Sequence, residues 1–563
     1  MKAISANDFL DELRYDIKEN DRIKAKLVLS KIGLVDDQTK KVALFEVNRA
    51  DDEFAIPLIV DLIAEHPEFY NRYPQFKEIL CAKALYHPEL LLSMVAKNGA
   101  GKRRRVLVEA LGELRLDEAT PKLVEILNQD EDEETIKTVI TALGMIGEGA
   151  AVTPVSEYLY SGNLVLTIAA IHSLGQMASP EAFQYLAEKL GDDPDLDIMI
   201  FDVFRTDQSP EAIAWLNISL ASHHAHQRNA AKQRLLDMGA KAVPVLIQNL
   251  HQEDPDLLVH TLNVLGEIGD ESAIAPIRNL LHNDPKNANV RFAAYEALGL
   301  LPVAKRAFAL AQGLSDPVLT VRAAAASAID HNFNSMLAAG LTNLLQSGKE
   351  EAASITETVL NAECGQIFLG LINGEIFRQY AIDFLVTHAH PDTRNYFVDL
   401  MKQNGYDDLA EVVTIQAKRD AASSLTVFAV DDSKMILNLY RGMLYDLGCE
   451  PVLFEFPAKA LQAVKDHPPD FIFTDLNMPH INGIELIRQV REHHDQDSLP
   501  IVMVTTQNET HDNHAALDAG VNAILRKPFT QERLEDVLFG MTNTPIRPVA
   551  PVIPVSASSG CLP

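Results

Sequence analysis

Cysteine is scarce in this chain of 563 residues. There are only four cysteines, and they lie far apart at Cys81, Cys364, Cys449 and Cys561. Thiolate metal sites use closely spaced cysteine pairs, and a disulfide framework needs more cysteines than a chain of this length provides. We therefore predict reduced thiols and no thiolate metal site.

Long apolar runs are also missing. No uninterrupted apolar stretch approaches the ~20 residues that a transmembrane helix requires. The first eight residues, MKAISAND, turn acidic at once and lack the basic and then apolar pattern of a signal peptide. The sequence therefore predicts a cytoplasmic protein without membrane insertion.

Positive charge is in deficit throughout. The chain has 49 Lys and Arg against 79 Asp and Glu, which gives a formal net charge of −30. Residues 425–541 hold 18 acidic and 9 basic side chains, a net −9, and the tail adds Arg547, so residues 1–424 carry −30 + 9 − 1 = −22. Because neither part is basic, we expect no binding to nucleic acid and no transcription-factor activity.

A Leu-Gly pair recurs after apolar helical stretches in the first three hundred residues. The copies are Leu111-Gly112, Leu143-Gly144, Leu174-Gly175, Leu265-Gly266 and Leu298-Gly299, with intervals of 32, 31, 91 and 33 residues. The long interval is close to three units and contains a weaker copy at residues 236–239. A proline then begins a second apolar helix, as at Pro121, Pro154, Pro244 and Pro276. We expect the glycine to adopt the positive φ that closes a helix end.

Each unit thus reads as helix, tight turn, helix, and stacked units build one continuous core. Residues 50–345 resemble the short HEAT-like repeats, also called the bilin-lyase type. We predict an all-α solenoid over residues 50–415, preceded by a helical cap at residues 1–49. Such solenoids offer long concave surfaces to protein partners.

The repeats carry few candidates for chemistry. The basic run at residues 102–105 is interpreted as a solvated stretch that enters a helix, and the alternative is a site for a phosphate or an acidic partner. His223, His224 and His226 are interpreted as a polar turn, because no carboxylate or cysteine completes a metal-ligand spacing. We find no nucleophile–base arrangement and no glycine-rich phosphate loop.

The pattern changes at Leu425 to short apolar runs that alternate with helical segments. The runs are LTVFAV (425–430), PVLF (451–454), DFIFT (470–474), PIVMV (500–504) and NAIL (522–525). This alternation predicts a doubly wound α/β domain with a five-stranded parallel sheet. Residues 416–424 are interpreted as a linker and the Pro- and Ser-rich residues 542–563 as a disordered tail.

Chemically active side chains stand at the carboxyl ends of these strands, where open α/β sheets bind ligands. They are Asp431 and Asp432 after the first, Asp475 after the third, Thr505 at the end of the fourth and Lys527 after the fifth. Three carboxylates in one crevice need a cation, and an oxygen-rich site suits Mg²⁺. A carboxylate nucleophile, a divalent ion and a fixed lysine are the parts that phosphoryl transfer requires.

These segments resemble bacterial two-component response regulators. The matching motifs are VDDS, DLNMPHING, VMVTT and KPF. The resemblance implies a flavodoxin-like receiver domain over residues 425–541, with Asp475 as the phosphorylated residue and Lys527 and Thr505 as the phosphoryl-stabilising and switch residues. It implies Mg²⁺ ligands at Asp431, Asp432, Asp475 and the backbone carbonyl of Asn477. It also implies structural roles for Pro479, Gly483 and Pro528, whose peptide bond is cis in the family, and Met478 stands in the family's position as well.

Two positions depart from the family pattern. Ile524 stands where the family usually has Tyr or Phe, and Thr506 where a small residue is usual. The first removes the aromatic switch, and the second adds bulk at the entrance to the acceptor. Coupling to the usual output face is therefore in doubt.

The leading interpretation is a signalling adaptor, whose receiver accepts a phosphoryl group from a sensor histidine kinase and controls an unknown protein partner of the repeats. Three alternatives stay open. The repeats act as a chromophore lyase, the receiver is a phosphate sink beside an independent scaffold, or the receiver has lost phosphorylation. The leading interpretation assigns no enzymatic activity beyond self-catalysed phosphoryl transfer and autodephosphorylation.

Overall fold

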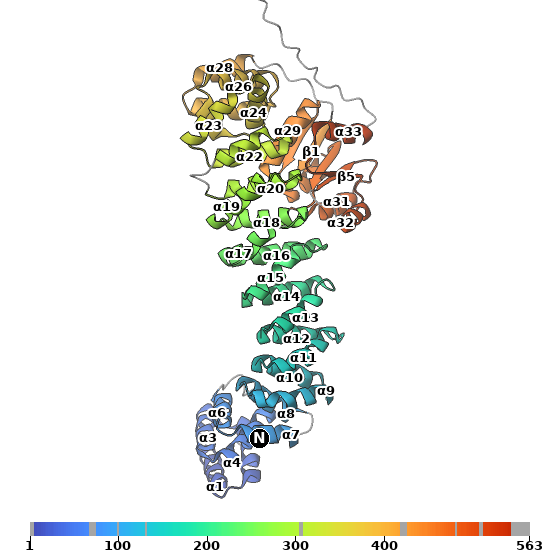
Figure 1. Cartoon of the computed structure of the whole chain (residues 1–563). Helices are drawn as coiled ribbons and strands as arrows, with labels where there is room; N and C mark the ends of the chain where they lie inside the picture. The colour runs from blue at the N-terminus through green and yellow to red at the C-terminus, as the bar shows by residue number, and fades with distance from the viewer. Residues whose placement is uncertain are drawn as a thin grey trace, which may run out of the picture. The chain divides into compact units, whose positions relative to one another are not determined.

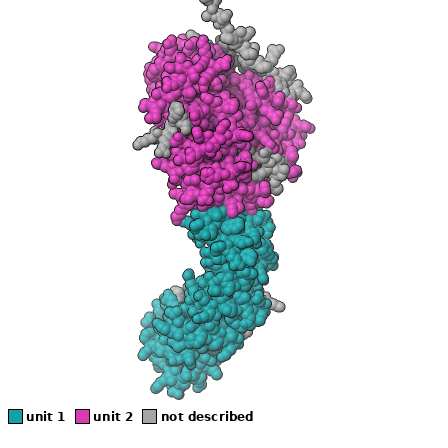
Figure 2. Space-filling model, viewed as in Figure 1, with its two compact units in different colours: residues 1–216 teal, residues 217–563 magenta. Residues whose placement is uncertain are grey.

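The computed structural model describes residues 5–66, 75–97, 101–129, 132–302, 308–416, 425–478, 481–505 and 510–541. The chain divides into two compact units, residues 1–216 and 217–563 (Figure 2). The predicted linker, apart from Gln416, and the predicted tail lie outside the described residues.

The first unit is helical. Its α-helices are α1 (Ala6–Lys18), α2 (Arg22–Leu29), α3 (Asp37–Arg49), α4 (Asp52–Glu65), α6 (Gln75–Ala84), α7 (Pro88–Lys97), α8 (Lys102–Glu113), α9 (Thr120–Gln129), α10 (Glu133–Ile146), α11 (Val152–Ser156), α12 (Leu164–Met177), α13 (Pro180–Glu188), α14 (Pro194–Asp207) and α15 (Pro210–Ser219), which contains the unit boundary. Longer and shorter helices alternate from α8 onward, as the repeat pattern predicts.

The second unit continues this alternation and then adds the α/β domain (Figure 1). Its repeat helices are α16 (Ala225–Met238), α17 (Val243–Asn249), α18 (Pro255–Ile268), α19 (Ile274–His282), α20 (Ala288–Leu300), α21 (Phe308–Ala311), α22 (Leu319–His331), α23 (Ser335–Leu345), α24 (Lys349–Asn361), α25 (Gly365–Leu371), α26 (Glu375–Thr387), α27 (Pro391–Gln403) and α28 (Asp407–Gln416).

The helix boundaries follow from local chemistry. Asp132, Asn163 and Asp254 cap α10, α12 and α18, where their side chains accept hydrogen bonds from backbone N–H groups of the first turn. The four prolines of the repeat pattern all lie in the first turn of the second helix of their unit, which confirms their predicted place; they are Pro121, Pro154, Pro244 and Pro276.

The predicted role of the Leu-Gly glycines is wrong. They lie inside helices, and their φ angles are not positive. Helix ends are closed three residues later instead, at Gly147, Ala178 and Gly269, which have φ of 78°, 47° and 75°. The repeated glycine has another purpose, which is close contact between neighbouring repeats.

A Cβ atom added at a repeated glycine would press on the next long helix, at under 3.0 Å for Gly112, Gly144, Gly175 and Gly266 and at 3.1 Å for Gly299. At Gly144 it would lie 2.6 Å from the Cβ of Ser173, and at Gly112 it would lie 2.8 Å from the Cα of Ala142. The pattern continues in the second unit, where the same atom at Gly266 would lie 2.8 Å from the Cα of Ala297. Glycine at this position therefore lets the backbones of consecutive long helices pack directly.

The α/β domain is a five-stranded parallel sheet in the order β2-β1-β3-β4-β5. Its strands are β1 (Thr426–Val430), β2 (Glu450–Phe454), β3 (Phe471–Asp475), β4 (Ile501–Thr505) and β5 (Ala523–Arg526), and its helices are α29 (Lys434–Asp446), α30 (Pro457–Asp466), α31 (Gly483–Arg491), α32 (Thr510–Asp518) and α33 (Gln531–Met541). Side chains of α29 and α33 fill one face of the sheet, and those of α30, α31 and α32 fill the other. The doubly wound prediction is confirmed, with each strand within one residue of its predicted limits.

Among the described residues, no single helix is long and apolar enough to cross a bilayer. The pair α6 and α7 passes that test only jointly and is bent by 105°. Cys81, Cys364 and Cys449 are free thiols, and Cys561 lies outside the described residues.

We predict that Gly144→Ala destabilises the first unit by about 1–3 kcal/mol, because the new methyl group overpacks the contact with Ser173. Trp215, the only tryptophan of the chain, belongs to this unit, so its fluorescence reports the transition in a urea titration. Gly149→Ala is the matched control, since a Cβ there meets nothing within 4 Å and its φ is not positive. Equal midpoints for the two variants would contradict the packing role.

Candidate functional site

The sheet brings the predicted side chains to one edge. Asp431 directly follows β1, Asp475 and Thr505 are the last residues of β3 and β4, and Lys527 directly follows β5. Asp431, Asp475 and Thr505 are buried. Strands β1, β3 and β4 are consecutive neighbours in the sheet and β5 adjoins β4, so parallel pairing sets their carboxyl ends side by side.

Lys527 contacts several of the residues at this edge. Its Nζ donates to Asp431 Oδ2 and to Asp475 Oδ1, each at 2.6 Å. Its backbone N–H donates to the carbonyl oxygen of Thr505 at 2.8 Å. The Lys527–Pro528 peptide bond is cis, as the family resemblance implied. One lysine therefore contacts the ends of β1, β3 and β4.

The loop after β3 fixes the Asp475 carboxylate. The backbone N–H of Asn477 donates to Asp475 Oδ2 at 2.7 Å. A Cβ at Gly483 would lie 2.2 Å from the carbonyl oxygen of Asp475, so only glycine fits where α31 begins. Met478 is buried in the core beside α31. Pro479 lies outside the described residues.

Negative charge exceeds positive charge in this crevice. Burial and the neighbouring Asp475 raise the pKa of Asp431, against the attraction of Lys527. Asp432 is exposed at the surface. Its pKa is also raised, mainly by the loss of water around its carboxyl group and next by repulsion from Asp475. Burial lowers the pKa of Lys527, but Asp431 and Asp475 outweigh it and the pKa stands well above its ordinary value. The lysine stays charged, and it is ion-paired with two of the three carboxylates, Asp431 and Asp475.

This donor set fits Mg²⁺. Carboxylates and a backbone carbonyl are the oxygen ligands that the ion prefers. In the part of the chain that the structure describes, no three Asp, Glu, His or Cys side chains are already arranged as a metal cage, these three carboxylates included. The Lys527 ammonium stands between two of them instead.

The two other candidate sites lie at the starts of helices α8 and α16. Arg103 pairs with Asp61 at 2.6 Å and Arg105 with Asp132 at 3.0 Å, so the basic run enters α8 with two of its arginines bound to neighbouring helices. His224 and His226 lie with ring centroids 5.6 Å apart at the start of α16, and no metal cluster includes them or any other described residue.

Comparison with known proteins agrees with this geometry. Residues 427–539 match the model of the response regulator receiver domain, and residues 88–164 and 243–330 match HEAT repeats. A chemotaxis protein CheY homolog of Campylobacter jejuni is 38% identical over 120 residues, which is 92% of that protein and 20% of this chain. The chain belongs to the response regulator receiver family.

Other relatives show the same domain in different settings. CheY1 of Helicobacter pylori is 34% identical over 94% of its length and 20% of this chain. The sensor protein GacS of Pseudomonas syringae is 32% identical over 22% of this chain and 14% of its own length. Among solved structures, CheY4 of Vibrio cholerae is 30% identical over its whole chain and 22% of this one, with a TM-score of 0.21. The family makes this chain a phospho-accepting protein of the two-component type with HEAT repeats.

The repeats of this response regulator reach the site, which sequence analysis did not foresee. Asn289 Nδ2 on α20 donates to the carbonyl oxygen of Lys527 at 2.7 Å. Glu296 on the same helix interacts electrostatically with Lys527, Asp431 and Asp432. Burial raises the pKa of Glu296 to about 8. Repulsion from the two carboxylates adds to this rise, and the attraction of Lys527 opposes it. The sequence gives only one sign of this role for Glu296, which is an acidic residue inside the apolar run AAYEALGL. The same pattern is equally typical of a helix face that is exposed to solvent.

The receiver also shares its core with the repeats. Ala323 of α22 is fully buried in the cluster formed by α29 and α33, and Phe292 of α20 packs against it. In Figure 1, α29 lies next to α22. At the far end of α29, Arg441 pairs with Glu363. The ring of Tyr445 meets His390 edge to face at 4.9 Å.

The contact between the receiver and the repeats also brings two acidic residues near each other, Asp446 and Glu357. Burial and the carboxylate of Glu357 on α24 raise the pKa of Asp446 on α29 to about 7. Burial likewise raises the pKa of Glu357, against the attraction of Arg322 and His388. Because the folded state then holds the Asp446 proton more tightly than the unfolded chain, stability falls as pH rises from about 4 to about 7 and stays low above it.

We predict that Asp446→Asn stabilises the second unit at pH 8 by at least about 1 kcal/mol relative to wild type, and that the gain shrinks at pH 5.5. Guanidinium unfolding followed by circular dichroism at both pH values measures it. Asp518→Asn, at an exposed position of the same domain, is the control and should show no such pH-dependent difference. A gain of the same size at both pH values would show that burial of a charged Asp446 is not the cause.

Proposed function

We propose that this response regulator takes a phosphoryl group onto Asp475 from a sensor histidine kinase and thereby controls a protein partner of its HEAT repeats. The observation that carries the proposal is the double contact of Lys527 Nζ with Asp475 and Asp431 at 2.6 Å each. It sets a fixed cation beside the carboxylate that has to act as nucleophile.

In the transfer step, an oxygen of the Asp475 carboxylate attacks the phosphorus of a phosphohistidine. The P–N bond breaks as the P–O bond forms, and the imidazole leaves with the bonding electron pair and takes up a proton. Lys527 faces the charge that develops on the phosphoryl oxygens. The hydroxyl of Thr505, at the end of the adjacent strand β4, donates to a phosphoryl oxygen once the group is in place.

Asp431, Asp432, Asp475 and the carbonyl oxygen of Asn477 would hold Mg²⁺. The ion supplies charge neutralisation for the phosphoryl oxygens when it is bound. The site needs the ion because the transferred group adds roughly two negative charges to a crevice in which three carboxylates lie near Lys527.

The receiver's contact with the repeats favours a coupled scaffold over a phosphate sink beside an independent module. A buried residue of α22, Ala323, belongs to the receiver's own core cluster. A module that acts alone has no need of a shared core. We place the protein in the cytoplasm, where its three described free thiols stay reduced. The proposal assigns no separate reaction to the repeats.

We expect acetyl phosphate with Mg²⁺ to phosphorylate wild type at Asp475 alone, because this is the carboxylate that contacts Lys527 at the end of β3. Mass spectrometry should find one hydroxylamine-labile phosphoryl group in wild type and none in Asp475→Asn. Asp470→Asn, a substitution at the residue directly before β3, should keep the label. Labelling that persists in Asp475→Asn would overturn the assignment.

We also expect phosphorylation to act through a rigid receiver surface and not through local unfolding of the repeats, since neighbouring repeats pack backbone to backbone. Hydrogen exchange with and without beryllofluoride, a phosphoryl mimic, should change in residues 500–530 and in the repeats that touch the receiver. Asp475→Asn serves as the unresponsive control. Faster exchange throughout residues 100–300 would contradict this mechanism.

A further inference from the structure

Helix α20 of the repeats touches the residue that is central to the receiver's site. Asn289 stands in the first turn of this helix, and its Nδ2 donates to the carbonyl oxygen of Lys527 at 2.7 Å. The backbone N–H of Asn289 is itself held by the side chain of Asn287, which caps the helix at 2.8 Å. The amide that contacts Lys527 is therefore presented from an anchored helix end.

The contact completes the fixation of Lys527. Its backbone N–H is held by Thr505, from within the receiver, and its carbonyl oxygen is held by Asn289, from the repeats. The side chain then reaches Asp431 and Asp475. A backbone fixed at both polar groups leaves the ammonium less freedom to leave its position between the two carboxylates.

We infer that helix α20 is part of the phospho-acceptor site, with Asn289 as a positioning residue for Lys527. The inference rests on the proposed function and adds to it that the acceptor chemistry is shared between the receiver and the repeats.

The contact predicts a selective signature. Asn289→Leu keeps the side-chain size and removes the donor, and it leaves the proposed Mg²⁺ ligands untouched. Affinity for beryllofluoride should fall by about threefold to tenfold, the range of one lost hydrogen bond, while Mg²⁺ affinity stays as in wild type.

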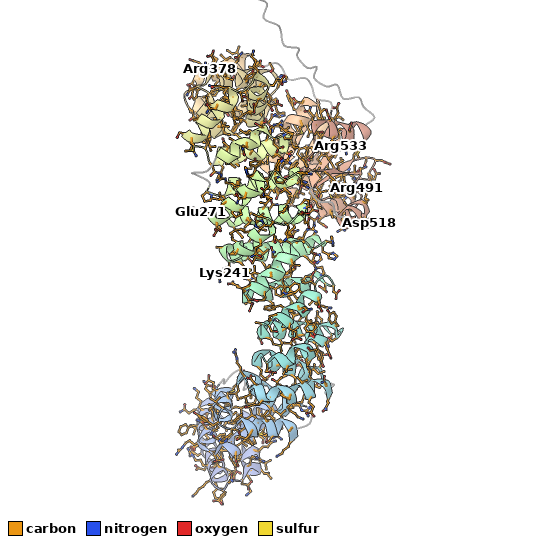
Figure 3. The ribbon with its side chains drawn as sticks, viewed as in Figure 1. Lys241, Glu271, Arg378, Arg491, Asp518 and Arg533 are labelled. Atoms are coloured by element: carbon orange, nitrogen blue, oxygen red, sulfur yellow. The ribbon has the colours of Figure 1, made fainter. Side chains whose placement is uncertain are left out.

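Isothermal calorimetry on the full chain measures both affinities, since the only tryptophan lies outside the second unit and cannot report on the receiver. Asn283→Leu is the matched control and Glu271→Gln is a second control, both at exposed positions near the same repeat. Figure 3 shows Glu271 on the edge of the repeats opposite the receiver.

The expected result is a selective loss of beryllofluoride affinity for Asn289→Leu, with both controls unchanged. Wild-type affinities in Asn289→Leu would overturn this inference and leave the proposed function standing. An equal loss of both ligands would also overturn it, since that is the result of damaged packing. Failure of the wild type to bind either ligand would overturn the proposed function and this inference together.

Discussion

The bridge from Lys527 to Asp431 and Asp475 is the interaction on which the receiver's chemistry depends. Two buried carboxylates repel each other in a low-dielectric crevice, and the lysine offsets that repulsion only while it stays between them. Removing the lysine from such a bridge would leave the buried carboxylates uncompensated, which costs about 3–5 kcal/mol. The bridge thus explains why the acidic residues can gather at one edge of the sheet at all.

A phosphoryl group on Asp475 has to disturb this balance, because it adds charge at the point where the lysine already serves two partners. The side chain of Lys527 is the natural carrier of the change, and its backbone is fixed by Thr505 on one side and by Asn289 on the other. In the proposed mechanism the response passes to the repeats through α20 without any unfolding.

The packing of the repeats would let them carry such a response. A Cβ atom added at Gly266 on α18 would lie 2.8 Å from the Cα of Ala297 on α20, and one added at Gly299 on α20 would lie 3.1 Å from the Cα of Ala328 on α22. Close-packed interiors deform little. In the proposed mechanism, a small change at the first turn of α20 would therefore be passed to both neighbouring repeats.

The sequence by itself determined the two architectures and the residues of the acceptor crevice. Apolar periodicity, strand-end carboxylates and first-turn prolines are local signals, and each strand begins and ends within one residue of its predicted limits. The Leu-Gly motif was recognised as a repeat but misread as a helix end, since its purpose lies in a contact between helices about thirty residues apart. Only the tertiary structure decided that Asn289 and Glu296 meet Lys527, and that Asp446 faces Glu357. These pairs are separated by 89 to 238 residues, and no local pattern records which surface of a solenoid a second domain will cover.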